Sequence, residues 1–165
     1  MKNAPAITLA LLLTTPWFFA GSCGEAALND RVAAYVDNEA VTLGELEEKY
    51  EAAKKISPDI RRIEVVNTMI NRLLLKREAA RRKILGASED AIIEQLIDLT
   101  IRSYIIIKHE EIERFFAENI AAAASSDIES IRAEIEKYLT EIEVNRRLAK
   151  LIEELRNRAY IKIQL

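Results

Sequence analysis

Few residues in this sequence have side chains suited to chemistry. The chain holds one histidine, His109, and one cysteine, Cys23. A catalytic triad or a histidine-rich metal site would need further partners for the imidazole, and no pattern in the sequence supplies them. Glu110 and Glu111 follow His109, but we interpret this cluster as the solvated start of a helix. The sequence therefore predicts no catalytic residue, no metal site and no cofactor.

The apolar residues are more informative than the charged ones. Ile105, Ile106 and Ile107 are consecutive, and at about 100° per residue they would span roughly 200° of a helix surface. Phe115 and Phe116 form a second adjacent pair of large apolar residues. Such residues are either enclosed on two sides, as in the central helix of a bundle, or partly uncovered. Both interpretations stay open, and the second would mean a groove for a partner chain or a dimer contact.

Composition restricts the class of protein. The chain has 165 residues, of which 50% are hydrophobic and 31% charged, and it contains only four glycines and three prolines. These values favour one globular, mainly helical domain. The net charge is −3, with basic and acidic residues interspersed, so the sequence lacks the basic stripe that a nucleic-acid phosphate backbone requires. We therefore expect no nucleic-acid partner.

The N-terminal segment is typical of a secretory signal peptide. It has one lysine, an apolar run over Ala4–Ala20 and then small residues. The run is shorter than the ~20 residues of a membrane-spanning helix and is interrupted by Pro5 and Pro16. We assign 1–26 to the signal peptide, with cleavage near 22–26.

Cys23 leaves two interpretations of this segment open. Its place after small residues suits a bacterial lipoprotein site, where the thiol is acylated and becomes the first mature residue, although Ala20 stands where such sites usually carry leucine. Alternatively, ordinary cleavage after Ala26 would remove Cys23. In either case the protein would be exported, and it would touch a membrane only through the signal segment or a lipid anchor.

The two ends of the remaining chain both predict strands. Alternation over Val32–Val36, a polar turn at Asp37–Asn38–Glu39 and a short apolar run at Ala40–Val41 indicate a hairpin. A two-stranded hairpin is marginally stable alone. The alternating segment Tyr160–Leu165 is a suitable third strand, so we expect both ends to meet in one small antiparallel sheet.

Helices are predicted between these strands. Thr42 and Glu45 form a capping box, which predicts a helix from Leu43 to about Lys55. Ser57–Pro58–Asp59 predicts the start of a second helix, because proline is well tolerated in a first turn. We expect that helix to end at Gly86.

The second half of the chain predicts three more helices. Ser88–Glu89–Asp90 begins one that carries apolar residues as far as Ile105, and Lys108–His109 marks a break before the next. Ser126 and Glu129 form another capping box, at the start of a pattern that runs over 127–159. This last pattern predicts either one helix of ~50 Å, longer than a compact domain, or a helix broken near Asn145.

Four segments, in this order, resemble the N-terminal chaperone domain of the periplasmic SurA-type chaperones, a family with PpiD-like and PrsA-like members. They resemble the opening hairpin with its first helix, a long helix with paired apolar residues, the segment that leads into a parvulin domain, and the closing helix and strand. The matching segments are Asp30–Tyr50, Val65–Ile84, Glu110–Asn119 and Leu151–Leu165.

One departure from the family pattern concerns activity. A parvulin-type prolyl isomerase domain usually stands between the third of these segments and the last helix. Here that place holds only the linker 121–126, and six residues cannot contain such a domain. The resemblance therefore predicts a chaperone domain over 27–165 that is not an enzyme.

The resemblance implies a mainly α, elongated domain that binds unfolded outer-membrane or secreted polypeptides in the periplasm as an ATP-independent holdase. One alternative is a structural or assembly subunit that docks on a single envelope partner or forms a homodimer, and another is an isomerase-family protein without its catalytic domain. The residues expected to bind client segments are Met69, Tyr104, Ile106, Phe115, Phe116 and Tyr138.

Overall fold

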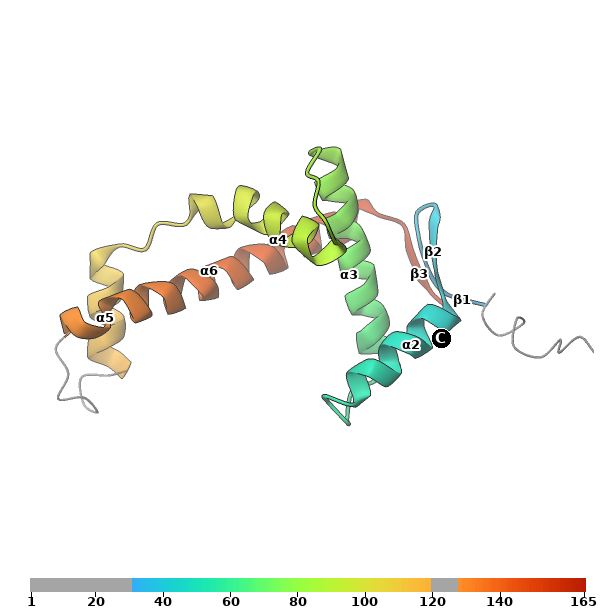
Figure 1. Cartoon of the computed structure of the whole chain (residues 1–165), viewed down its shortest axis with the longest axis horizontal. Coiled ribbons are helices and arrows are strands. Elements are labelled where there is room, and N and C mark those ends of the chain that lie inside the picture. The colour runs from blue at the N-terminus through green and yellow to red at the C-terminus, as the bar shows by residue number, and fades with distance from the viewer. Residues whose placement is uncertain (1–30, 120–127) are drawn as a thin grey trace, which may run out of the picture.

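The computed structural model describes residues 31–119 and 128–165. The protein is mainly α with one small antiparallel sheet, as the sequence predicts (Figure 1). Its elements are β1 (Val32–Val36), β2 (Glu39–Thr42), α2 (Leu43–Lys54), α3 (Arg62–Arg81), α4 (Glu89–Thr100), the 3₁₀ turn η1 (Arg102–Tyr104), α5 (His109–Asn119), α6 (Ile128–Arg158) and β3 (Ile161–Ile163).

The sheet joins the two ends of the described chain. Its strand order is β2-β1-β3, so that β1 pairs antiparallel with both neighbours. Asp37, in the β1–β2 turn, has a left-handed φ of 51°, and its Oδ1 accepts a hydrogen bond of 2.7 Å from the backbone N–H of Tyr160. The prediction that the N-terminal hairpin and the C-terminal strand meet is confirmed.

Arg77 of α3 fastens this sheet to the helices. Its Nη1 lies 2.8 Å from Oδ2 of Asp37 and its Nε lies 2.8 Å from Oε1 of Glu39. Its Nη2 donates a hydrogen bond of 2.7 Å to the carbonyl oxygen of Val36. One guanidinium thus binds both strands of the hairpin.

The predicted start of α2 is confirmed in detail. The backbone N–H of Glu45 donates to Oγ1 of Thr42 at 3.2 Å, and the N–H of Thr42 donates to Oε2 of Glu45 at 2.9 Å. This reciprocal pair is the capping box, which satisfies backbone groups that the first helical turn leaves without partners.

The predicted start of the second helix was wrong. Ser57–Pro58–Asp59 forms a turn, closed by a 3.1 Å hydrogen bond from the N–H of Ile60 to the carbonyl of Ser57, and α3 begins only at Arg62. The extended backbone of Arg61, with ψ of 150°, separates the turn from the helix. Pro58 therefore sets a turn between α2 and α3 and is not a first helical residue.

The predicted end of that helix was also wrong. α3 stops at Arg81, and Lys83 adopts a left-handed φ of 60°. The N–H of Ile84 donates to the carbonyl of Ala79 and the N–H of Lys83 to that of Ala80, which is the Schellman arrangement. The chain thus ends the helix with a lysine at the position that glycine usually occupies, before Gly86 is reached.

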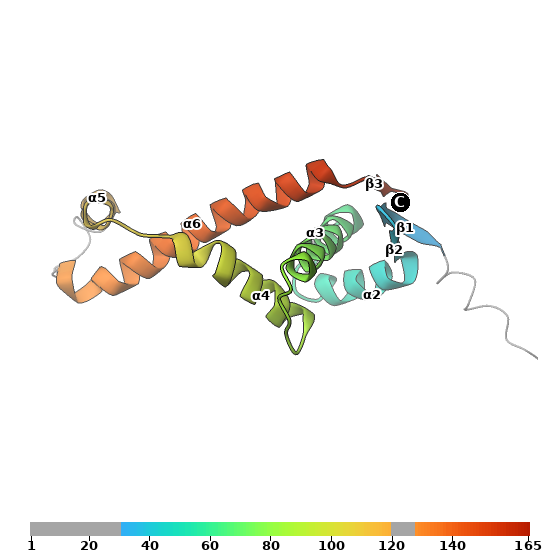
Figure 2. The ribbon, with the colours of Figure 1, turned by 90° about the horizontal axis from the view of Figure 1, so that it is seen from above.

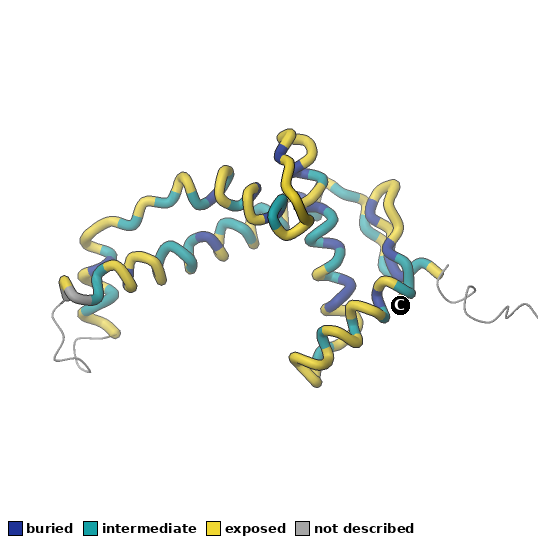
Figure 3. The backbone as a smooth tube through the Cα atoms, in the orientation of Figure 1, coloured by how far each residue is buried: buried dark blue, intermediate teal, exposed yellow. Residues whose placement is uncertain are grey.

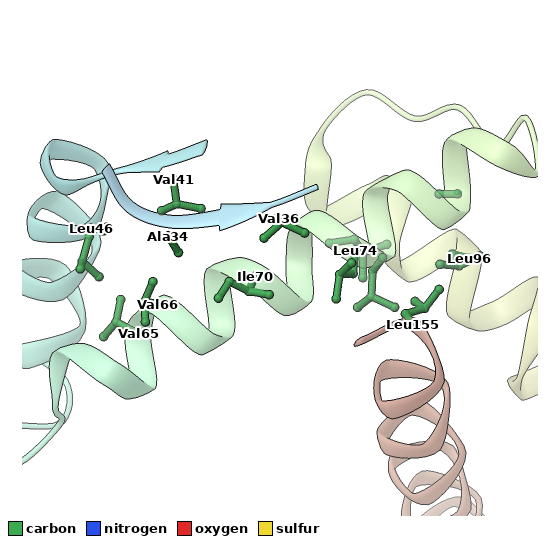
Figure 4. Close-up of a cluster of buried hydrophobic side chains, with 14 of the residues drawn as sticks. Ala34, Val36, Val41, Leu46, Val65, Val66, Ile70, Leu74, Leu96 and Leu155 are labelled. Atoms are coloured by element: carbon green, nitrogen blue, oxygen red, sulfur yellow. The ribbon is translucent and has the colours of Figure 1, made fainter. Parts of the chain in front are cut away.

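The core lies in what we call the body, comprising the sheet, α2, α3, α4 and the part of α6 after residue 147. Figure 4 shows α3 as its central helix. At one end of α3, Val66 and Ile70 pack beneath the sheet, and at the other Leu74 meets side chains of α4 and α6. The fully buried side chains with the largest volumes are Leu46, Ile70, Leu96, Val36 and Val66.

An arm projects from the body. It comprises residues 101–119 and 128–147. α6 runs without a break from the arm into the body (Figures 1 and 2). Of the two alternatives for this segment, the single helix is observed, and Asn145 does not interrupt it. Its 31 residues, at about 1.5 Å each, give a helix length of ~45 Å. Figure 3 shows mostly exposed and half-buried backbone along the arm.

The isoleucine run in the arm is not helical, contrary to the prediction. α4 ends at Thr100, one 3₁₀ turn follows, and residues 105–108 form a connecting segment without helical structure. Ile106 is exposed whereas Ile105 and Ile107 are half-buried, which is the alternation of an extended chain. Three successive β-branched residues favour this conformation over a helix. The 200° sweep inferred for a helix therefore does not occur.

Several sequence-based assignments lie outside the described residues. They are the segment 1–26 with Cys23, the linker 121–126, and the capping residue Ser126. Among the helices of the described parts, none combines the length and apolar character needed to cross a membrane.

Candidate functional site

The six apolar residues expected to bind client segments lie in two separate places. Met69 belongs to α3, in the body, and is half-buried. The other five lie in the arm, where Tyr104 and Ile106 are 69% and 86% exposed. Phe115 and Phe116 are half-buried there, and Tyr138 is 54% exposed. The structure therefore divides these residues between the body and the arm.

A groove of about 860 Å³ lies around Met69 in the body. It is bordered by the edge strand β2, by α2, by α3 and by the first turn of α4. Its volume is in the range of ~300–1,000 Å³ that is usual for ligand-binding pockets. The apolar residues that line it are Ala40, Val41, Ala53, Ile60, Val65, Met69 and Leu73.

The spacing along α3 explains how one helix serves both the core and the groove. Val65, Met69 and Leu73 line the groove and are four residues apart, so they form one row on the helix surface. Val66 and Ile70, each one position further along, are fully buried. The apolar residues of α3 thus cover a wide arc of the helix surface. One part of that arc is buried in the core, and the other part lines the groove.

Ion pairs between α3 and α4 surround the charged side of the groove. Nε of Arg72 lies 2.9 Å from Oε1 of Glu89, and Nζ of Lys76 lies 3.0 Å from Oε2 of the same carboxylate. Arg72 also pairs with Asp90. The hydrogen bond from Lys76, together with those from Arg72, holds the pKa of Glu89 below its usual value. These half-exposed pairs contribute little to stability, but they neutralise one another.

The remaining charges at the groove are also engaged, with one exception. Glu45 caps α2 and Glu39 pairs with Arg77. Lys49 has no ion-pair partner among residues 31–119 and 128–165. The groove therefore offers an apolar floor with a largely neutralised rim, which suits an uncharged ligand with apolar side chains.

The arm carries a second group of exposed apolar side chains. The rings of Phe115 on α5 and Tyr138 on α6 have centroids 5.4 Å apart and planes at 47°, a favourable tilted arrangement. Ile142, one turn after Tyr138, is 46% exposed. Ile112 and Ile135 are buried beside them, so α5 is held on α6 by few side chains.

A second cleft, of about 410 Å³, lies where the arm joins the body. Arg82, Arg146, Arg147 and Lys150 line it, which gives it a basic character. However, Arg146 and Arg147 both bind Glu143, each at 2.6 Å, and hydrogen bonds from these two guanidiniums lower the pKa of Glu143 to about 2. Because most of the positive charge is compensated within the protein, we assign no anion-binding role to this cleft.

His109 lies where the sequence places it, at the start of a helix. It is the first residue of α5, with its side chain 53% exposed. Its Nε2 lies 2.9 Å from Oε1 of Glu113, and its Nδ1 is in contact with Arg132. Within the described ranges, no three histidine, cysteine, aspartate or glutamate side chains are grouped so as to hold a metal ion.

Sequence reasoning found one residue of the groove and missed most of its lining. Met69 was among the expected residues, whereas Ala40, Thr68 and Leu73 were not. One available signal was the hairpin itself, because β2 has no strand predicted on its outer side. The other was the four-residue spacing from Val65 through Met69, which continues to Leu73.

Comparison with known proteins adds no assignment. The sequence matches no protein-family model, and a search of curated proteins finds no match to it either.

Proposed function

We propose that this protein is an ATP-independent chaperone of the holdase type, which binds extended apolar segments of unfolded outer-membrane or secreted polypeptides in the periplasm. The observation that carries the proposal is the groove of about 860 Å³ beside β2, with its apolar floor and its internally paired charges. The resemblance of four segments to SurA-type chaperone domains, and the signal-like sequence over 1–26, support the same proposal.

The size of the groove suits weak and reversible attachment. Burial of a few hundred Å² of apolar surface would contribute several kcal/mol at ~25 cal/mol per Å². Association itself costs about 4–15 kcal/mol through lost freedom of motion. The surplus is small, so a client segment would exchange rapidly, and release would need no ATP.

No enzymatic activity is part of the proposal. The segment between α5 and α6 is too short for a parvulin domain, so we expect a proline-peptide isomerisation assay to give only the uncatalysed rate. Acceleration by the purified protein would contradict this assignment. Mass spectrometry of the mature N-terminus would decide between lipidation of Cys23 and ordinary cleavage.

An experiment on aggregation tests the groove directly. The mature protein, 27–165, is mixed with two unrelated, chemically unfolded proteins, one of them an outer-membrane β-barrel, and light scattering is followed on dilution of the denaturant. We expect suppression of aggregation for both clients. Thr68→Arg should raise the concentration needed for half-suppression about fivefold, because a guanidinium at this exposed groove position resists burial against apolar side chains.

Asn157→Arg is the matched control, since it makes the same charge change at an exposed position of α6 outside the groove. It should suppress aggregation as well as the wild type. Equal activity of the Thr68→Arg and Asn157→Arg variants would exclude the groove as the client site. Failure of the wild type with both clients would refute the holdase function itself.

A second candidate function is that of a structural subunit that forms a homodimer or docks on one partner. The exposed row of Tyr138 and Ile142 on α6 favours it, because apolar residues one turn apart on a long helix are typical of helix–helix contacts. A single partner recovered at fixed stoichiometry, or a dimer at micromolar concentration that Tyr138→Glu dissociates, would favour this role over the holdase.

A further inference from the structure

The groove is bordered by a strand whose outer side has no strand partner. In the order β2-β1-β3, β2 is an edge strand and pairs only with β1. The backbone groups of an edge strand that point outward are a template for another extended chain. The hydrogen bonds of the sheet identify which groups of β2 these are.

The pairing of β1 with β3 fixes the direction of the backbone groups in β1. The N–H of Asp37 donates to the carbonyl of Tyr160, and the N–H of Gln164 donates to the carbonyl of Ala33, both at 2.8 Å. Residues 33 and 37 of the hairpin therefore direct their backbone groups toward β3. Because the direction alternates along a strand, Ala34 and Val36 direct theirs toward β2.

This alternation determines the orientation of Ala40. Val36 lies opposite Glu39 and Ala34 lies opposite Val41, so Glu39 and Val41 are the residues of β2 that face β1 with their backbone groups. Ala40, opposite Tyr35, directs its N–H and C=O away from the sheet. Ala40 is exposed and lines the groove.

The next outward-facing N–H of β2 is already occupied. The N–H of Thr42 donates to the carboxylate of Glu45 in the capping box of α2. The outer edge is thus closed at the start of the helix and open at Ala40. An extended chain that enters the groove would meet the two free backbone groups of Ala40 on one side and the floor residues Met69 and Leu73 on another.

The charges at the groove specify the kind of chain that fits. Arg72 and Lys76 are neutralised by acids of α4, and Glu39 by Arg77. Lys49 is the one lining charge with neither an ion pair nor a capping hydrogen bond among the described residues, so most charged side chains entering the groove would have to compete with existing pairs. An uncharged segment with alternating apolar residues meets no such obstacle, and its backbone supplies the donor and the acceptor that Ala40 needs.

We propose that an extended, uncharged segment of an unfolded polypeptide adds to β2 as a fourth strand, with hydrogen bonds to the backbone of Ala40 and alternate side chains on the apolar floor. The proposal rests on the holdase function and specifies how the client is held. Recognition through the backbone would make the site tolerant of client sequence, while the floor selects apolar side chains at every second position.

The test uses a labelled peptide with alternating threonine and apolar residues, and two twins of it that carry N-methyl groups on the odd or on the even amides. Successive amides of an extended peptide point to opposite edges, so only one set can face β2. By fluorescence anisotropy, we expect one twin to bind at least about tenfold more weakly and the other to bind nearly as well as the parent peptide.

Two variants of the protein complete the test. Ala40→Pro removes the outward N–H and should therefore weaken binding of the parent peptide about tenfold. The sheet should keep its pairing, because the hydrogen bonds of β2 to β1 come from the residues on either side of Ala40. Ala40→Val keeps the N–H and should bind within about twofold of the wild type. Proton exchange at the Ala40 amide, measured in the wild type, should slow when the parent peptide is added, and this readout does not depend on folding of the proline variant.

The outcomes separate this proposal from the function on which it rests. Equal weakening by both methylated twins, with unchanged exchange at Ala40, would overturn strand addition. If the wild type still suppresses aggregation in that case, the holdase function stands and the client is held through side chains only. Peptide-dependent dimerisation, seen by light scattering, would mean that a second copy of the chain occupies the edge, and would also overturn the proposal.

Discussion

Replacement of Arg77 by methionine would measure how firmly the terminal sheet is held on α3. The guanidinium binds the carboxylates of Asp37 and Glu39 and the carbonyl of Val36, at 2.7–2.8 Å. Arg77→Met removes these three contacts and keeps an unbranched apolar chain of similar length, so that the packing of the stem is largely retained. The decrease in the free energy of unfolding should therefore reflect the loss of the polar contacts.

The expected cost is about 2 kcal/mol. Asp37 and Glu39 are 45% and 52% exposed and regain water when the arginine is removed, so each ion pair contributes only about 0.5 kcal/mol. The charge-assisted bond to the partly buried carbonyl of Val36 contributes about 1 kcal/mol more. In ~1 M salt the ion-pair part should be screened and the cost should fall toward 1 kcal/mol.

Urea unfolding followed by circular dichroism at pH 7 would test this value. The control is Arg158→Met, because Arg158 and Glu154 are 3.9 Å apart and both more than half exposed, so that this variant should lose less than about 0.5 kcal/mol. If Arg77→Met costs no more than Arg158→Met, the Arg77 guanidinium does not fasten the hairpin to α3.

Three further outcomes are expected. Because the pKa of Glu143 is lowered to about 2 from its usual 4.5, its contribution is present above pH 4.5 and is lost as the pH falls toward 2, so Glu143→Gln should flatten the pH dependence of the unfolding free energy in that window. Lys83→Gly should raise stability by about 0.5 kcal/mol, whereas Lys83→Val should lower it, since φ is 60° there; thermal unfolding of both variants checks this. Phe115→Ala removes the ring contact with Tyr138 and should speed hydrogen exchange in α5 while leaving α3 unchanged.

The elements that the sequence predicted correctly are those with local chemical signals. Thr42 and Glu45, which are three residues apart, form the capping box that fixes the start of α2, and alternation of apolar and polar residues identifies β1 and β3. The error at the start of α3 occurred where a distant contact decides the outcome. The start of α3 is delayed to Arg62, whose guanidinium binds Glu47 of α2 at 2.7 Å, and Pro58 serves the turn that allows α3 to return along α2. No local pattern contains that information.

The groove was harder to predict than the fold. Met69 could be identified as apolar, but whether it faces the core or a surface depends on the angle at which β2 and α4 approach α3. The isoleucine run was predicted wrongly for a local reason, because a helical period was assumed for residues whose β-branched side chains favour an extended segment. Tyr138 is half exposed because the arm has only α5 and the connecting segment to cover it, and the sequence gives no sign of how thin that cover is.

The central place of β1 has a consequence for the order in which the protein is completed. Its first neighbour, β2, follows after a two-residue turn, but the contact between Asp37 and Tyr160 spans 123 residues. During synthesis or export from the N-terminus, β1 therefore keeps one side open until β3 is released. We expect a chain that terminates before β3 to retain that open side and to be removed by proteases, whereas a chain that includes β3 closes it.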